Sequence, residues 1–267
     1  MNLIYQYWDG ELRSGVEASR KNIAEYAARI GAEHRFEHNP RYFAKSLGAE
    51  SKYYGAFRPI HDNEFDQYDN VLFLDSDIFA VEDLQENVFD AFSLESEIGM
   101  CTEPFQPKQR TITLGQITSA RDEKWAKIIK QIWDADLPRT EEGLLQVYNS
   151  GVVLYSREAR IKARERFVDF KEYIQKMKSS GMINFYALDQ NYLHAMIFIC
   201  DMKLQEMHNG WNSYIHYTRD RNNPNKRVND CRTSETKLVH AQGAGLDRLD
   251  EEALYRVVNL PESEWKI

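Results

Sequence analysis

The first hundred residues alternate short apolar runs with stretches of helical spacing. Residues 2–8 form a run rich in tyrosine and isoleucine that ends at an Asp-Gly turn signal, and this pattern predicts a strand. Across residues 16–30, apolar side chains recur at the spacing of one helix face, and the glycine that follows supplies a stop. Ser14 and Glu17 have the spacing of a capping box, so we expect a helix to begin there.

The alternation continues and predicts the class of fold. Residues 33–37 are a second strand candidate, and residues 43–57 have a helical pattern. Residues 71–74 are apolar throughout, as a strand of a parallel sheet covered on both faces requires. Strands that alternate with helices predict an α/β sheet with right-handed crossovers. Ligands of such sheets bind beyond the carboxyl ends of the strands, so the chemistry is expected just after an apolar strand.

Later segments give a less regular pattern. It predicts strands at 98–102, 152–155 and 197–204, helices at 120–134, 157–177 and 250–258, and a loop at 103–118 with two prolines and a glycine. The segment 217–235 is polar, and with Lys237 it carries six basic residues: Arg219, Arg221, Lys226, Arg227, Arg232 and Lys237. Such a loop either faces an anionic ligand or is simply solvated. No repeat or low-complexity linker interrupts the chain, which favours one domain.

The composition of the chain excludes several classes of protein. The chain has 267 residues, of which 42% are hydrophobic and 28% charged, an ordinary globular balance. A formal net charge of −8 argues against a general nucleic-acid binder. The apolar runs are too short to cross a bilayer and the first residues lack the form of a secretion signal, so we expect no integral membrane segment. The three cysteines are far apart without a CxxC pair, which predicts neither a disulfide framework nor a structural zinc site and favours a reducing, cytoplasmic location.

The strongest chemical signal is the pair Asp75 and Asp77 directly after the apolar run 71–74. In a regular strand the two carboxylates would lie on the same face, where their charges repel unless a cation lies between them. Carboxylate oxygens suit Mg²⁺ or Mn²⁺, which commonly also bind substrate phosphates. The alternative is a surface Asp-Ser-Asp turn that caps a helix. The position at the ligand end of a parallel sheet favours the metal site.

The Asp-Ser-Asp sequence after an apolar strand resembles the DxD motif of nucleotide-sugar-dependent glycosyltransferases with the GT-A fold. The Gln-Tyr-Asp-Asn sequence at 67–70 is similar to the lead-in of the glycogenin-like and lipopolysaccharide galactosyltransferase family, family 8. This resemblance implies an α/β fold with a mixed, mainly parallel central sheet flanked by helices. It implies a single Rossmann-like GT-A domain over residues 1–245, with a helical extension at 246–267 packed on the same domain.

The same resemblance implies roles for the motif and for two further segments. Asp75 and Ser76 would face the donor, and Asp77 would ligate the metal. The Asn-Ser-Gly-Val sequence that begins at Asn149 resembles a family strand whose amide contacts the sugar, although a loop-to-strand turn that needs glycine explains it equally well. Asp189 and Gln190 resemble a family segment beneath the donor sugar, where they would stabilise charge at the anomeric carbon; Asp189 could also be a helix N-cap.

Near the C-terminal end, His240 and Gly243 resemble the family's His-x-x-Gly, in which the histidine ligates the metal and the glycine backbone approaches the diphosphate. An imidazole ligand favours Mn²⁺ over Mg²⁺. The alternative for His240 is a hydrogen-bonded core histidine. The family often has a lysine three residues after the glycine, but here Leu246 occupies that position. Either Arg248 or the basic loop replaces that cation, or the diphosphate is held differently.

The first strand and the helix before the aspartates hold other donor-binding candidates. In GT-A enzymes the first strand holds the nucleobase, so Tyr5, Tyr7 and Trp8 are candidates for stacking on it. Strand alternation separates the two tyrosines from Trp8, and the sequence does not say which set faces the core. Lys52 and Arg58 lie where relatives often carry a cation that contacts donor groups, although solvated surface charges are the more usual state.

Together these motifs predict a metal-dependent glycosyltransferase that moves a sugar from a UDP- or GDP-linked donor to an acceptor hydroxyl on a glycan, a lipid-linked molecule or a protein. The family resemblance implies retention at the anomeric carbon. An inverting enzyme would need a carboxylate base, for which Glu103 is the candidate. Two rival hypotheses are a haloacid-dehalogenase-type phosphatase, which also has an aspartate pair after a strand, and a non-catalytic protein that binds nucleotide sugars or glycans.

Overall fold

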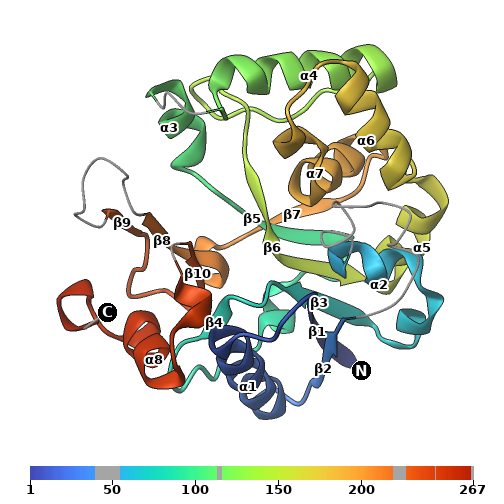
Figure 1. Ribbon diagram of the computed structural model, residues 1–267. Helices are drawn as coiled ribbons and strands as arrows, with labels where there is room; N and C mark the ends of the chain where they lie inside the picture. Colours follow the sequence, from blue (N-terminus) through green and yellow to red (C-terminus); the bar gives the residue numbers. More distant parts are fainter. Residues whose placement is uncertain (40–54, 113–115, 219–226, 244, 266–267) are drawn as a thin grey trace.

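The computed structural model describes residues 1–39, 55–112, 116–218, 227–243 and 245–265. Two sheets organise the chain (Figure 1). The central sheet has six strands in the order β2-β1-β3-β6-β5-β7. In chain order these are β1 (Asn2–Trp8), β2 (Glu33–His38), β3 (Asn70–Leu74), β5 (Ile98–Thr102), β6 (Tyr148–Ser156) and β7 (Leu204–Met207).

The central sheet is mixed, as the sequence predicts, with parallel pairs in the majority. β1 runs parallel to β2 and β3, and β7 runs parallel to β5. β6 is antiparallel to both of its neighbours, with Leu74 of β3 opposite Val152. Because β6 is antiparallel to β3, its first residues lie at the same edge of the sheet as the carboxyl end of β3. This edge carries the candidate site.

A second, smaller sheet has the order β4-β10-β8-β9 and continues from the turn after β3. Its strands are β4 (Ile78–Ala80), β8 (Ser213–Thr218), β9 (Arg227–Asp230) and β10 (Leu238–Gln242). β10 is antiparallel to β4 and parallel to β8. Pairing of β10 with β4 brings a late segment of the chain beside the turn that follows β3.

Helices cover both faces of the central sheet (Figure 1). α1 (Ser14–Arg29) lies on one face, and α4 (Ser119–Trp133), α6 (Phe170–Ser179) and α7 (Asp189–Ile199) lie on the other. The remaining α-helices are α2 (Arg58–His61), α3 (Gln106–Ile112), α5 (Arg157–Arg166) and α8 (Glu251–Asn259). Short 3₁₀ helices are η2 (Asn63–Gln67), η3 (Val88–Ala91), η4 (Asn184–Ala187), η5 (Asn209–Asn212), η6 (Leu246–Arg248) and η7 (Glu262–Glu264).

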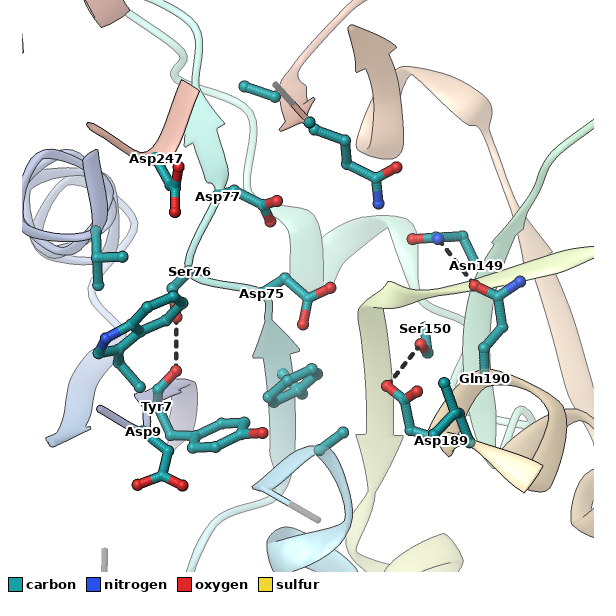
Figure 2. A pocket seen from close by; sticks show the side chains of 18 of the residues that line it. Tyr7, Asp9, Asp75, Ser76, Asp77, Asn149, Ser150, Asp189, Gln190 and Asp247 are labelled. Atoms are coloured by element: carbon teal, nitrogen blue, oxygen red, sulfur yellow. Dashed lines mark hydrogen bonds between the residues drawn. The ribbon is translucent and has the colours of Figure 1, made fainter. Parts of the chain in front are cut away.

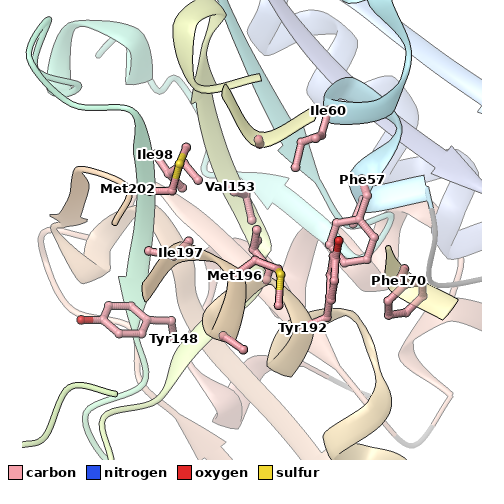
Figure 3. Packing of buried hydrophobic residues seen from close by; sticks show 14 of the residues in the cluster. Phe57, Ile60, Ile98, Tyr148, Val153, Phe170, Tyr192, Met196, Ile197 and Met202 are labelled. Carbon is pink, nitrogen blue, oxygen red and sulfur yellow. The ribbon is translucent and has the colours of Figure 1, made fainter. Parts of the chain in front are cut away.

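The main core lies between the central sheet and helices α4, α6 and α7. Phe57, Phe170 and Tyr192 are fully or almost fully buried, and the rings of Phe57 and Tyr192 meet edge to face with centroids 4.9 Å apart (Figure 3). A second cluster joins α1 to the other face through Tyr26 and Leu72. Burying one large apolar side chain contributes about 1.5–3 kcal/mol, so apolar residues on both faces of β3 hold the sheet between its helix layers.

Several predicted elements are confirmed. The strands at 2–8, 33–37, 71–74 and 98–102 are present, as are the helices near 120–134 and 250–258. α8 begins after Asp250, whose carboxylate accepts a hydrogen bond from the backbone N–H of Ala253. α8 then packs on the second sheet through apolar residues that include Leu254 and Val257. In the described part of the chain, no helix is both long enough and apolar enough to cross a bilayer.

Other predictions were wrong for identifiable reasons. The loop at 103–118 contains α3, because Pro107 falls in the first turn of that helix, where proline is tolerated. The helix at 157–177 is two helices, and Asp169 caps the second by accepting from two backbone N–H groups. The strand at 197–204 is instead the end of α7, a turn in which Asp201 has a φ of 49°, and the start of β7.

One predicted helix cap needs correction, and two predicted segments are described only in part. α1 begins at Ser14, but Arg13 occupies the N-cap position without a side-chain hydrogen bond, so Ser14 and Glu17 do not form a capping box. The predicted helix at 43–57 lies largely outside the described residues. Part of the segment 217–235 is strand, in β8 and β9, and residues 219–226 of that segment are not described.

Candidate active site

A cavity of about 630 Å³ opens at the edge of the central sheet where β1 and β3 end and β6 begins (Figure 2). The end of β10 and the first turn of α7 complete its walls. Five aspartates line it, and no lysine or arginine does so among the described residues; the five are Asp9, Asp75, Asp77, Asp189 and Asp247. A cavity with this lining is suited to hold a cation.

The two aspartates of the DxD sequence meet His240 at the wall of this cavity, where His240 is buried behind the lining residues. His240 Nε2 lies 3.1 Å from Asp77 Oδ1 and 3.8 Å from Asp75 Oδ2. One oxygen or nitrogen atom from each of the three side chains lies within 4.8 Å of the others. Asp75 and Asp77 are partly exposed to the cavity, whereas His240 is fully buried. The structure therefore brings together the three predicted metal ligands.

Backbone hydrogen bonds fix the turn that carries these aspartates. The N–H of Asp75 donates to the carbonyl of Gly151 on β6 at 2.8 Å, and the N–H of Ala241 on β10 donates to the carbonyl of Asp77 at 2.9 Å. Ser76 turns away from the metal candidates, and its hydroxyl donates to the carbonyl of Tyr7 at 2.6 Å. The turn is thus tied to three strands that are far apart in the sequence.

Gly151 leaves the space that these side chains occupy. A Cβ at this position would lie 2.5 Å from His240 Cε1, 2.8 Å from Asn149 Oδ1 and 2.9 Å from Asp75 Oδ2, all closer than real Cβ contacts. A glycine is therefore required for the imidazole and the carboxylate to converge. The turn explanation for this glycine is incomplete, because its φ is not in the left-handed region.

The electrostatics of the cluster favour a positive charge. Burial and the neighbouring Asp77 raise the pKa of the Asp75 carboxyl well above its usual value, against the opposing effect of His240. Burial alone would lower the pKa of His240, but the negative charges of Asp77 and Asp75 outweigh it and raise that pKa. Without a cation, the cluster therefore holds on to protons that an ordinary carboxylate or imidazole would lose.

Asp189 and Gln190 face the cavity from the first turn of α7, opposite the aspartate pair (Figure 2). The Ser150 hydroxyl donates to Asp189 Oδ2 at 3.3 Å, and Asn149 Nδ2 donates to Gln190 Oε1 at 3.1 Å. Leu188, not Asp189, holds the N-cap position of α7. Burial raises the pKa of Asp189 to about 6, so this carboxylate is ionised at neutral pH.

The donor-binding candidates on the first strand lie in two different environments. Tyr7 and Trp8 line the cavity. Tyr5 is fully buried, packs against Phe65, and donates its hydroxyl to Glu37 Oε2 at 2.8 Å. The structure therefore places Tyr7 and Trp8, but not Tyr5, at the cavity.

The residues predicted to contact the donor or its diphosphate differ in their positions relative to the cavity. Arg58 is buried in an ion cluster with Glu37 and Glu64. Gly243 lines the cavity, whereas Arg248 is exposed and is absent from the described lining. Lys52 lies outside the described residues.

Of the basic loop, Arg232 pairs with Asp230 and donates to the carbonyls at the end of α8, and Lys237 pairs with Glu86. These contacts occupy both side chains within the fold. Arg219, Arg221 and Lys226 lie outside the described residues, and the side chain of Arg227 is not described.

Sequence reasoning missed residues that surround the site. Asn212 of η5 contacts Asn149 and His240, and Tyr214 of β8 contacts Glu103 and His240. Asp247 lines the cavity and forms an ion pair with Arg13. No motif marks these residues, because their position depends on how the second sheet packs on the first.

Solved structures include one with the same fold as this chain. The protein-family models and the curated proteins that were searched contain no match to this chain. A glycosyltransferase involved in the glycosylation of the major capsid of PBCV-1 superposes with a TM-score of 0.52 at 12% identity, covering 95% of this chain and 98% of that one. The chain has the fold of a solved glycosyltransferase.

Two other solved glycosyltransferases are less similar. Mouse xyloside xylosyltransferase 1 gives a TM-score of 0.47 at 12% identity and covers 90% of this chain and 97% of that one. GlyE of Streptococcus pneumoniae gives 0.39 at 12% identity, with 79% of this chain and 46% of that one covered. The strand order of the structure and its match to the PBCV-1 glycosyltransferase confirm the α/β class and the mixed sheet predicted from the sequence.

Proposed function

We propose that this protein is a metal-dependent glycosyltransferase that moves a sugar from a nucleoside-diphosphate sugar to an acceptor hydroxyl. The observation that carries this proposal is the convergence of Asp75, Asp77 and the buried His240 at the wall of a cavity, at the strand ends of a fold shared with a glycosyltransferase. The order of the motifs supports a relationship to the glycogenin-like family. The donor would be UDP- or GDP-linked, and the acceptor a glycan, a lipid-linked molecule or a protein.

The three side chains fit a divalent metal ion such as Mn²⁺ or Mg²⁺. Two ligands of one ion, each about 2.1 Å from it, lie at most about 4.2 Å apart. The distances from His240 Nε2 to Asp77 and Asp75, 3.1 Å and 3.8 Å, are within that limit. The absence of a Cβ at Gly151 keeps the space clear. Two carboxylates with one imidazole favour Mn²⁺; when bound, the ion would act as a Lewis acid toward the leaving diphosphate.

The residues of the opposite wall have distinct roles in the proposed reaction. Asp189 lies across the cavity from the aspartate pair, and with a pKa of about 6 it is negatively charged at neutral pH. An ionised carboxylate there would stabilise positive charge that develops at the anomeric carbon. Gln190 would hydrogen-bond the sugar beside it. We propose retention at the anomeric carbon, with the acceptor proton passing to an oxygen of the leaving diphosphate.

The rest of the cavity provides contacts for the nucleotide. Tyr7 and Trp8 offer aromatic faces on which a base could stack. Gly243, with a φ of 92°, brings its backbone to the cavity without a side chain, which lets a diphosphate approach closely. We propose further cationic contacts to the donor from Lys52, Arg248 and the basic loop. We also propose a cytoplasmic location, which the three free cysteines support.

A thermal-shift panel tests the proposal. UDP, GDP and other nucleoside diphosphates would be added with and without Mn²⁺, since a ligand that binds the folded state raises its melting temperature. We expect one base to be preferred and its shift to require Mn²⁺. Release of free nucleoside diphosphate from the matching nucleotide sugar should then be measured for the wild type and for Asp77→Asn. Full activity in that variant would contradict the proposal.

The same samples separate the two rival functions. Hydrolysis of p-nitrophenyl phosphate with Mg²⁺, without release of nucleoside diphosphate, would support a phosphatase. Metal-dependent binding of a nucleotide sugar with no turnover for any donor and acceptor would support a non-catalytic binding protein.

A further inference from the structure

A chain of hydrogen bonds runs behind the metal candidates, from Glu103 through Asn149 and Asn212 to His240. Its members come from four segments: the residue after β5, the start of β6, η5 and β10. All four side chains are buried, with exposed fractions of 5%, 4%, 3% and 0%. Buried amides in one connected network must be fully satisfied, so the orientation of each fixes the next.

The orientation of Asn149 follows from a backbone group that can only donate. The N–H of Gly151 donates to Asn149 Oδ1 at 2.8 Å. The amide nitrogen of Asn149 therefore points the other way, where it donates to Glu103 Oε1 at 2.9 Å. It also donates to Gln190 Oε1 at 3.1 Å (Figure 2). Together with the bond from Asn212, these contacts use both donors and both acceptor positions of the Asn149 amide.

Asn149 in turn orients Asn212, which contacts the histidine. Asn212 Nδ2 donates to Asn149 Oδ1 at 2.8 Å. Its oxygen therefore faces His240, 3.2 Å from Nδ1, and accepts a hydrogen bond from that nitrogen. With the proton held on Nδ1, Nε2 carries the lone pair and faces Asp75 and Asp77. In the structure Nε2 accepts a hydrogen bond from Gln242 Nε2 at 2.9 Å, so a metal would bind Nε2 in place of that amide.

Glu103 anchors the far end of the chain. Its Oε1 accepts from Asn149 and also from the Tyr214 hydroxyl at 2.6 Å. The Tyr214 ring stacks on the imidazole of His240, with centroids 5.0 Å apart and planes 27° from parallel. Glu103 is absent from the described lining of the cavity. These contacts do not suit a base that must reach an acceptor hydroxyl.

We propose that Glu103, Asn149 and Asn212 are positioning residues that select the Nδ1–H form of His240 and so present Nε2 to the metal. This inference rests on the proposed function in so far as it assumes a metal bound by Asp75, Asp77 and His240. It assigns Asn149 to the support of the metal site and Glu103 to the anchor of the network. Loss of such a hydrogen-bond partner typically weakens metal affinity about 10–100-fold.

The test uses Asn212→Leu, which removes both hydrogen bonds and keeps a side chain of similar size. Mn²⁺ affinity would be measured from the electron paramagnetic resonance signal of free Mn²⁺, without any donor sugar. We expect affinity to fall about 10–100-fold. The matched control is Asn70→Leu, which removes an amide bond to Asn2 at the opposite end of β3 and should leave Mn²⁺ affinity unchanged.

Proton NMR of the Zn²⁺-loaded protein gives a reading that loss of packing alone would not change. The imidazole Nδ1–H of His240 should give a slowly exchanging signal in the wild type and in Asn70→Leu, because Asn212 accepts its hydrogen bond. The signal should be lost in Asn212→Leu. An unchanged signal together with unchanged Mn²⁺ affinity in the folded Asn212→Leu protein would overturn the inference.

Two variants at the anchor keep the inference testable if Asn212→Leu does not fold. Glu103→Gln retains an oxygen that accepts from both Asn149 and Tyr214, so its Mn²⁺ affinity should stay within about threefold of the wild type. Glu103→Leu retains no accepting oxygen, and its Mn²⁺ affinity should fall about tenfold or more. Equal affinity in the two variants would refute the positioning role. A wild type that binds no Mn²⁺ would instead refute the metal site of the proposed function.

Discussion

Replacing Asp189 by asparagine should remove a buried charge and stabilise the fold at neutral pH. Burial raises the pKa of this carboxyl from 3.8 to about 6, so the folded protein holds its proton more tightly than the unfolded chain does. Asparagine has nearly the same shape, carries no charge, and keeps an oxygen that can accept from Ser150. Any gain in stability therefore measures the cost of the charge rather than a change in packing.

The sign and size of the effect follow from proton linkage. Between the two pKa values the folded state binds more protons than the unfolded state, so the free energy of unfolding falls as pH rises through this range. At pH 7 the difference between the folded and unfolded pKa values of Asp189 corresponds to about 3 kcal/mol in the free energy of unfolding. At pH 5 it corresponds to about half of that. Because solvent reaches Asp189 through the cavity, we expect a gain of about 1–2 kcal/mol at pH 7 for Asp189→Asn.

Urea unfolding of both proteins at several pH values between 5 and 7.5 measures this gain. The stability difference should be largest at pH 7 and should fall by about half at pH 5, with little change in the slope against urea. Asp247→Asn is the control, because Asp247 also lines the cavity but is paired with Arg13, so its replacement should not stabilise the fold. An Asp189→Asn protein that is no more stable than the wild type at pH 7 would refute the reasoning.

Three other predictions concern the same cavity. Gly151→Ala would place a Cβ 2.5 Å from His240 Cε1 and should lower Mn²⁺ affinity at least tenfold while circular dichroism stays native; unchanged affinity would contradict the packing argument. Gly55→Ala would place a Cβ 2.1 Å from Tyr7 Cε1 and should weaken nucleoside-diphosphate binding in calorimetry without changing Mn²⁺ affinity; equal nucleotide affinity would exclude Tyr7 from the base site. Since the pKa values of Asp75 and His240 are both raised, protons compete with the metal, so Mn²⁺ affinity should increase from pH 6 to pH 8, and a flat profile would contradict this competition.

The sequence predicts the framework of the fold because the framework depends on local patterns. An uninterrupted apolar run marks β3 as buried on both faces, and the aspartates that follow it must then lie at the edge of the sheet. The same logic fails where one pattern suits two structures. The apolar residues from Ile197 onward suit a strand, but they complete the buried face of α7, and the strand β7 begins only at Leu204.

The second half of the site depends on contacts that no local pattern specifies. His240 reaches Asp77 only because β10 pairs with β4, and Asn212 reaches His240 only because η5 precedes the parallel neighbour of β10. The family resemblance supplied His240 as a ligand candidate. Asn212 and Tyr214 had no such signal, and their roles follow only from the orientation of side chains in three dimensions.

Under the proposed function, the charges of the cavity favour binding of the metal before the nucleotide. A nucleoside diphosphate is an anion, yet the described lining offers five aspartates and no lysine or arginine. Like charges in a partly buried cavity repel strongly, so the diphosphate cannot bind well until a cation has neutralised the cluster around Asp75 and Asp77. Metal and nucleotide should therefore bind cooperatively, each raising the affinity for the other by the same factor. The raised pKa of Asp189 agrees with the proposed role, since a site that stabilises positive charge in a reacting sugar would hold uncompensated negative charge while it is empty.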